Sequence, residues 1–183
     1  SSTAGGAYMP GLSDYVIAVK GNGRAFLAGP PLPKAATGEI ATEEELGGAQ
    51  MHATVSGLAE YLAENDGQAV QMCRELLHRL QWNKDCAVPR RRVYSEPLYD
   101  ADELAGVIPC DYRNPYDMRE LVARVVDGSD FMDFKPRYGA ATVCIQADIV
   151  GLPCGIIGNN GPIDPAGATK ATQLLFEGDP MGE

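Results

Sequence analysis

The sequence predicts an α/β fold, because glycine-rich turns, strand-like segments and helix-like segments follow one another along the chain. A glycine turn leads into a helix near the start, at Gly5-Gly6, and a strand, a glycine loop and a helix follow one another near the end, around Gly158–Gly161. Between them, β-branched and aromatic runs alternate with segments whose apolar residues recur at helical spacing. The two similar layouts indicate an internal repeat of fold.

The first half of the chain contains short apolar segments separated by turns. The expected elements are strands over 15–19 and 25–28, a turn at 21–23, a loop with a brief helical or extended piece over 32–39, and a helix from 42 that ends at 47–48. Thr42 and Glu45 have the spacing of a capping box, which marks the start of that helix.

The strongest helix prediction covers residues 66–80. Asp66 is expected to cap it, and His78 lies off its apolar stripe and is expected to face solvent. The stripe consists of Val70, Cys73, Leu76, Leu77 and Leu80. The segment Leu58–Ala63, just before this helix, fits a strand or a helical turn equally well.

Residues 83–97 are expected to link two folding units, because they combine basic residues and prolines with little periodicity. After them, a helix over 116–126 is expected to bury Leu121, Val122, Val125 and Val126. The other expected elements are a capped helical turn over 100–104, a cap at Asp117, a helix end at Gly128, a strand over 131–134, a hairpin of 142–150 and 153–157 that turns at Gly151, a strand-breaking loop over 158–162, and a helix over 165–173 capped by Asp164.

The composition argues against several classes of function. The net charge of −10 argues against broad nucleic-acid binding, and no apolar run is long enough to cross a bilayer. The five cysteines are odd in number and form no C-x-x-C pair, which indicates reduced thiols in a cytosol-like compartment, the bacterial cytoplasm or the mitochondrial matrix. His52 and His78 are the only histidines and have no cysteine at ligand spacing, so we expect no metal site.

The opening stretch, Ser1–Asp14, is the first candidate for a functional site. Gly5 and Gly6 lack a Cβ, so the backbone can turn tightly there and another molecule can approach its N–H groups. Such groups at the start of a short helix can hold a developing negative charge, as on an enolate or a tetrahedral oxygen. From these residues alone, an ordinary tight turn in a packed domain is the more frequent explanation of a glycine pair.

A set of motifs, taken in order, resembles one known family. The set comprises Ser2–Tyr8 with Pro10, Phe26–Leu32, Lys34–Glu39, Leu46–Ala49 with His52, Arg124–Ser129 and Gly155–Gly161. Together they resemble the carboxyltransferase (β) subunit of biotin-dependent acyl-CoA carboxylases, most closely the 3-methylcrotonoyl-CoA and geranyl-CoA carboxylase branch. The resemblance extends to about Gln173, after which the chain departs from the family's pattern.

The resemblance implies a crotonase-like fold with two α/β domains in one subunit. Residues 1–82 then correspond to the later part of the N-terminal carboxyltransferase domain, 83–97 to the linker, and 98–183 to the beginning of the C-terminal domain. The chain would begin after the strand that precedes the glycine turn and end before the second domain's own oxyanion turn. The family forms homo-oligomers, often hexamers, with the active site between the first domain of one subunit and the second domain of a neighbour.

The chemistry that the resemblance implies is carboxyl transfer to an acyl-CoA. In this family CO2 moves from carboxybiotin, carried by a biotin carboxylase and biotin carboxyl carrier (α) subunit, to the acyl group through an enolate. Decarboxylated biotin serves as the base, and the protein orients the reactants and stabilises the oxyanion. The family's first oxyanion turn falls on Gly5, Gly6 and Ala7, whose backbone N–H groups are then the catalytic atoms.

Two further groups of residues are implied as substrate contacts. Lys34 or the run Arg90–Arg92 is expected to meet the phosphates of coenzyme A, which are natural partners of basic side chains. A loop of the second domain is expected to line the biotin or acyl pocket, with a purely structural turn as an equal alternative. This loop consists of Gly158, Asn159, Asn160 and Gly161.

Two other functions remain compatible with the sequence. A crotonase-like decarboxylase or hydrolase would act on an acyl-CoA without biotin, and a biotinylated partner separates it from a carboxyltransferase. A degenerate paralogue or an assembly component would bind acyl-CoA without turnover. The departing tail and the missing second oxyanion turn favour this last alternative.

Overall fold

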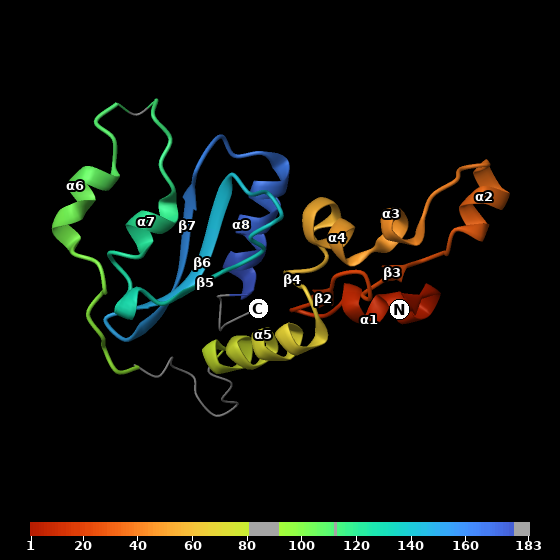
Figure 1. Cartoon of the computed structure of the whole chain (residues 1–183), viewed down its shortest axis with the longest axis horizontal. Coiled ribbons are helices and arrows are strands. Elements are labelled where there is room, and N and C mark those ends of the chain that lie inside the picture. The colour runs from red at the N-terminus through yellow and green to blue at the C-terminus, as the bar shows by residue number, and fades with distance from the viewer. Residues whose placement is uncertain (81–91, 112, 178–183) are drawn as a thin grey trace. The chain divides into compact units, whose positions relative to one another are not determined.

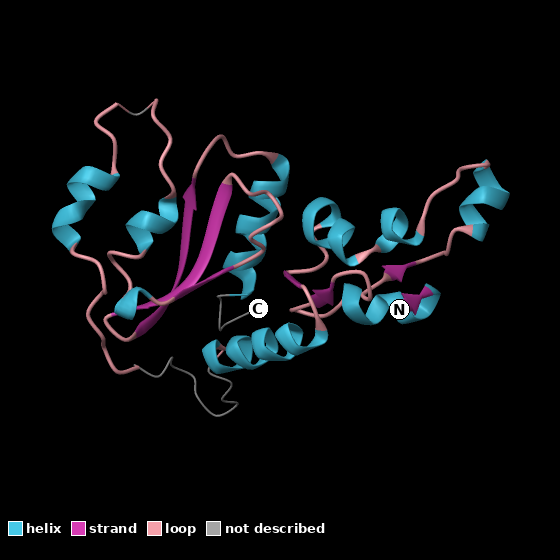
Figure 2. Ribbon diagram, in the orientation of Figure 1, coloured by secondary structure: helices cyan, strands magenta, loops and turns pink. Residues whose placement is uncertain are grey.

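The computed structural model describes residues 1–80, 92–111 and 113–177 (Figure 1). The chain divides into two compact units, Ser1–Trp82 and Asn83–Glu183. Helices and strands alternate within both units, which confirms the predicted α/β class (Figure 2).

The first unit is built on two pairs of short parallel strands, β1 with β3 and β2 with β4. Parallel neighbours require a crossover connection, and the helices of this unit supply it. The elements are β1 (Ser2–Thr3), η1 (Ala4–Ala7), α1 (Tyr8–Gly11), β2 (Ile17–Val19), β3 (Ala25–Phe26), α2 (Pro31–Thr37), α3 (Glu43–Gly47), α4 (Ala49–Met51), the π-helix η2 (His52–Ser56), β4 (Tyr61–Ala63) and α5 (Asp66–Arg79).

Most local signals in the first unit are confirmed. The capping box is present, since the Thr42 side chain accepts from the Glu45 amide and the Glu45 side chain accepts from the Thr42 amide. The undecided segment before α5 forms the buried strand β4. In the segment 32–39, where a loop with a brief helical or extended piece is expected, the helical alternative is present as α2. Pro31 lies at its first position, and Gly38, with φ 77°, ends it.

Helix α5 has the predicted length but a different cap and a different environment. Asn65, not Asp66, is the N-cap, because its side chain accepts a hydrogen bond from the Gln68 amide at 2.9 Å. The predicted apolar stripe is largely exposed among the described residues: Leu76 is buried, but Val70 is 60% and Leu77 56% exposed. His78 is exposed, as expected.

The second unit is a three-stranded antiparallel sheet in the order β5-β6-β7, with helices on both faces. Val143 and Ile145 of β6 pack with Val122 and Val126 on one face, and α8 packs against the sheet through the alternate residues of β6, such as Thr142. The elements are η3 (Ala101–Glu103), α6 (Leu104–Val107), α7 (Met118–Val122), η4 (Asp127–Ser129), β5 (Phe131–Asp133), β6 (Thr142–Ile149), β7 (Leu152–Asn159) and α8 (Pro165–Glu177).

The predicted hairpin is confirmed, with Val150 and Gly151 as its two-residue turn. Both residues have positive φ, 52° and 74°, as a type I′ turn requires. A valine is unfavourable in this conformation, and Asp127 compensates by accepting hydrogen bonds from the Val150 and Gly151 amides at 2.8 and 2.6 Å. Asp127, which lies outside the hairpin, therefore stabilises its turn.

Three predictions for the second unit need correction. The strand does not break at residue 158, because β7 pairs with β6 through Asn159. Val125 is 41% exposed, because the helix α7 ends at Val122 and the following turn buries Ala123 and Val126 instead. Helix α8 runs on to Glu177, beyond the predicted end. The caps at Asp117 and Asp164 are confirmed, since their side chains accept from the Arg119 and Gly167 amides.

The cap of α5 gives a direct test of this fold. We expect Asn65→Ala to lower the free energy of unfolding of the first unit by about 1 kcal/mol, because the Gln68 amide loses its partner. Asp66→Asn is the matched control and should cost only a few tenths of a kcal/mol, since it removes a first-turn charge and no cap. Thermal unfolding with hydrogen exchange of α5 measures both. An equal or larger loss in the control would show that Asp66 is the cap after all.

Candidate functional site

The glycine turn of the first unit lies directly after β1, in the single helical turn η1. Gly5 and Gly6 are exposed and Ala7 is half-buried. The left-handed backbone conformation that the turn needs is adopted by Ala4, with φ 51°, and neither glycine has a positive φ. Gly5 and Gly6 therefore lie in a tight turn that leads into a short helix, as predicted, but the turn needs no positive φ at either glycine.

The space beside both glycines of the turn is open. A Cβ added to Gly5 or to Gly6 would meet no atom within 4 Å among the described residues. Neither the backbone angles nor the packing of this unit requires glycine at these two positions. The first N–H groups of a helical segment also have no partner within that segment. The turn is thus an exposed backbone segment with open space beside both glycines.

In the second unit, Gly158 and Asn159 belong to β7 and pair with Val143 and Thr142. Gly158 is required by packing, because a Cβ there would lie 2.6 Å from the Met118 side chain. Asn159 is exposed, and its Nδ2 donates to the Gly161 carbonyl at 2.9 Å. Of these residues, Asn159 is the one that presents a polar side chain outward.

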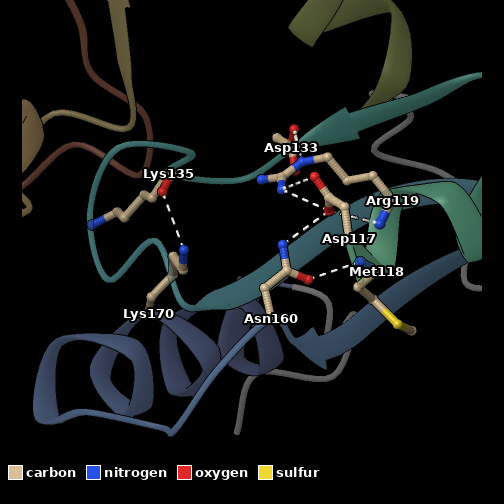
Figure 3. Close-up of polar contacts among 7 residues, drawn as sticks. All are labelled: Asp117, Met118, Arg119, Asp133, Lys135, Asn160 and Lys170. Atoms are coloured by element: carbon tan, nitrogen blue, oxygen red, sulfur yellow. Dashed lines mark hydrogen bonds and ion pairs between the residues drawn. The ribbon is translucent and has the colours of Figure 1, made fainter. Parts of the chain in front are cut away.

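Asn160 forms hydrogen bonds through its backbone N–H and through both polar atoms of its side chain. Its Oδ1 accepts from the Met118 amide at 2.7 Å, and its Nδ2 donates to Asp117 Oδ1 at 2.9 Å (Figure 3). Its backbone N–H donates to the Ala141 carbonyl at 2.8 Å. Asn160 therefore fastens the loop after β7 to the start of α7, 42 residues away.

A charge network continues from Asn160 to the sheet. Arg119 donates through Nε to both Asp133 oxygens, at 3.1 and 2.9 Å, and pairs with Asp117 at 3.2 Å (Figure 3). The hydrogen bond to Asp133 raises the pKa of Arg119 above its ordinary value. Burial opposes ionisation of Asp117, but the donors of Arg119 and Asn160 outweigh it and lower the pKa of Asp117. Both shifts favour the charged forms of Arg119 and Asp117.

Lys170 of α8 is a buried amine that the sequence analysis missed. It is 1% exposed, and its Nζ donates to the Lys135 carbonyl at 3.3 Å (Figure 3). Burial lowers the pKa of Lys170, and burial raises the pKa of the neighbouring Cys144 thiol. A signal was present, because Lys170 shares the buried stripe of α8 with Gly167 and Leu174 at helical spacing.

The predicted phosphate contacts belong to different units of the chain. Lys34 is exposed in the last turn of α2. Arg92 pairs with Asp148 at 3.1 Å, and its amide donates to the Gly151 carbonyl at 2.7 Å, so it braces the hairpin. Arg90 and Arg91 lie outside the described residues.

Two features are absent from the part of the chain that the structure describes. No group of three or more His, Cys, Asp or Glu side chains is placed to hold a metal ion in residues 1–80, 92–111 and 113–177. No helix in that part of the chain combines the length and the apolar character that a membrane crossing requires.

Comparison with known proteins decides the family. The carboxyl transferase domain matches residues 1–177. The chain belongs to the carboxyl transferase domain family. It is 48% identical, over 96% of its length, to a probable biotin-dependent acyl-coenzyme A carboxylase beta2 subunit of Mycobacterium tuberculosis, and 45% identical, again over 96%, to the mitochondrial methylcrotonoyl-CoA carboxylase beta chain of Dictyostelium discoideum.

The fold agrees with this membership. A crystal structure of transcarboxylase 12S, with methylmalonyl-coenzyme A and methylmalonic acid bound, superposes on 96% of the chain with a TM-score of 0.87 at 30% identity. This confirms the crotonase-like fold that the resemblance implied. The chain spans 33% and 30% of the two carboxylase subunits and 35% of the transcarboxylase chain, about a third of each.

The fastening role of Asn160 predicts a pH-dependent defect. In Asn160→Asp the new carboxylate cannot donate to Asp117, and the two like charges raise the pKa of the pair. We expect a loss of about 1–3 kcal/mol in stability of the second unit at pH 7. The loss should shrink as the pH falls toward about 4–5, because one protonated carboxyl can again donate.

Asn159→Asp, with the same charge change on the exposed neighbour, is the matched control. Thermal unfolding of both variants between pH 4 and pH 8 measures the difference. Equal losses in the two variants, or a loss in Asn160→Asp that does not depend on pH, would contradict the fastening role.

Proposed function

We propose that this chain forms part of the carboxyltransferase component of a biotin-dependent acyl-CoA carboxylase. In this role it moves CO2 from carboxybiotin to an acyl-CoA through an oxyanion-stabilised enolate. Membership of the carboxyl transferase domain family supports the proposal, as do the names of the M. tuberculosis and D. discoideum relatives. The second relative's name favours 3-methylcrotonoyl-CoA as the substrate, and geranyl-CoA is the alternative.

One observation carries the proposal, namely the empty space beside Gly5 and Gly6. At the position where the family places its oxyanion turn, this open space leaves room for another molecule to approach the backbone amides. In the proposed reaction that molecule is the acyl thioester, whose oxygen gains negative charge when the enolate forms. The amides of Gly5, Gly6 and Ala7 would donate to that oxygen, an arrangement that stabilises the transition state more than the ground state.

The second unit would contribute the loop after β7. Asn159 is the side chain best placed to meet biotin or the acyl group, because it is exposed. Gly158 and Asn160 would act behind it, by packing and by hydrogen bonding. In this scheme residues 1–82 are the later part of the N-terminal carboxyltransferase domain, 83–97 are the linker, and 98–183 begin the C-terminal domain.

The proposed partners follow from the same role. Biotin would arrive on a biotin carboxylase and carrier (α) subunit, and Lys34, an exposed cation, would meet the phosphates of coenzyme A. A homo-oligomer, hexameric as in the transcarboxylase 12S assembly, would complete the site. Free thiols at Cys73, Cys110, Cys144 and Cys154 suit the cytoplasm or the mitochondrial matrix.

The test is a carboxyl-transfer assay with free carboxybiotin as the CO2 donor and a series of acyl-CoA thioesters as acceptors. We expect Gly6→Val to lower kcat by about 10²–10³-fold, because its side chain would fill the space that the thioester oxygen needs. The fold should persist, since no atom of the described chain lies within 4 Å of the new Cβ.

Gly11→Val is the matched control, because Gly11 also has open space and no positive φ but lies outside the turn, at the end of α1. Its kcat should stay near that of the wild type. Equal activity in Gly6→Val and Gly11→Val would reject the turn as the site. Turnover of acyl-CoA that does not depend on biotin would reject carboxyl transfer.

A further inference from the structure

His52 lies in the π-helix η2 of the first unit and is fixed at both ring nitrogens. Its Nε2 is 2.6 Å from the Ala25 carbonyl, and its Nδ1 is 2.7 Å from Ser56 Oγ. A carbonyl can only accept, so Nε2 carries the proton toward Ala25. In the neutral ring, Nδ1 then accepts from the Ser56 hydroxyl. The bond to Ala25 joins segments 27 residues apart.

Ala25 connects His52 to the glycine turn through the backbone. It belongs to β3, where it pairs with Ser2 of β1, and the Ser2 amide donates to the Arg24 carbonyl at 2.8 Å. Strand β1 has two residues and runs directly into Ala4 and the turn. The position of β3 therefore sets the position at which the turn begins.

Besides His52, two features lie next to the Ala25 carbonyl. A Cβ added to Gly47 of α3 would lie 2.1 Å from the Ala25 oxygen, so α3 already contacts this group closely. A cavity of about 220 Å³ lies beside the same residue and is lined by residues that include Ser2, Pro10, Ala25 and His52. The hydrogen bond from His52 ties β3 to η2 at the edge of this cavity.

We infer that His52 is a positioning residue for the turn at Gly5, Gly6 and Ala7. It acts through the Ala25 carbonyl and the β3–β1 pairing and does not touch the substrate. The inference rests on the proposed function for its effect on catalysis. Its structural part, the restraint of β1 by the ring, stands independently.

The catalytic part is tested with His52→Leu and His52→Gln in the carboxyl-transfer assay. The leucine variant loses the donor and should lower kcat by about 10²-fold with little change in KM for the acyl-CoA, because a small misplacement of a catalytic group is costly. The glutamine amide can still donate to Ala25 and should restore most of kcat. Ser56→Ala is the control, since it removes the Nδ1 contact and the Leu58 amide bond but keeps the bond to Ala25, and it should stay near wild type.

The structural part is tested without activity. Nitrogen NMR of the wild-type ring should show a protonated Nε2 and a bare Nδ1. The Ser2 amide should exchange with solvent faster in His52→Leu than in wild type or His52→Gln, while amides of α5 stay protected. A ring protonated at Nδ1 alone, or unchanged Ser2 exchange in His52→Leu, overturns the inference.

The two experiments distinguish a failure of the proposed function from a failure of the positioning role of His52. A wild-type chain without carboxyl transfer rejects the proposed function, while ring protonation and Ser2 exchange still decide the restraint. An active wild type whose kcat is unchanged in His52→Leu overturns the positioning role itself.

Discussion

The first unit depends on one backbone group, the carbonyl of Ala25. It accepts the hydrogen bond of His52, it touches Gly47 so closely that no side chain fits there, and it lies in the strand that pairs with β1. Strand β1 pairs with β3 through Ser2 and Thr3 and runs directly into the turn. The exposed turn that follows takes its position from contacts behind it.

The second unit positions its exposed loop in the same way. The outward residue, Asn159, adjoins Asn160, whose side chain is occupied by the Met118 amide and by Asp117. Arg119 pairs with both Asp117 and Asp133 and so connects these hydrogen bonds to the sheet. In each unit, the segment proposed to meet a ligand is exposed. A polar side chain that is already occupied by hydrogen bonds, His52 or Asn160, holds it in place. Such support gives a site on a loop the rigidity that catalysis needs.

Signals within a few residues predicted the local structure well, and contacts between distant residues explain the misses. The capping box at Thr42, the caps at Asp117 and Asp164 and the hairpin turn each involve neighbours, so the sequence shows them. The roles of His52 and Asn160 depend on partners 27 and 42 residues away, which no pattern reveals. The helical spacing could mark Lys170 as buried but not its partner 35 residues away. The prediction of Asp66 as the cap of α5 is wrong for another reason. Asn65 and Asp66 are both residue types that cap helices, and only the backbone geometry determines which of them does so.

The central claim is that the amides of the Gly5–Gly6 turn bind the oxygen of an acyl thioester. Its most direct test is the infrared stretching frequency of the thioester carbonyl, measured with a carbonyl-¹³C-labelled acyl-CoA bound to the protein. Donation by the turn should shift this frequency below its value in water, and the shift should vanish in Gly6→Val but persist in Gly11→Val. A bound thioester at the free frequency, or a shift that survives in Gly6→Val, would contradict the claim.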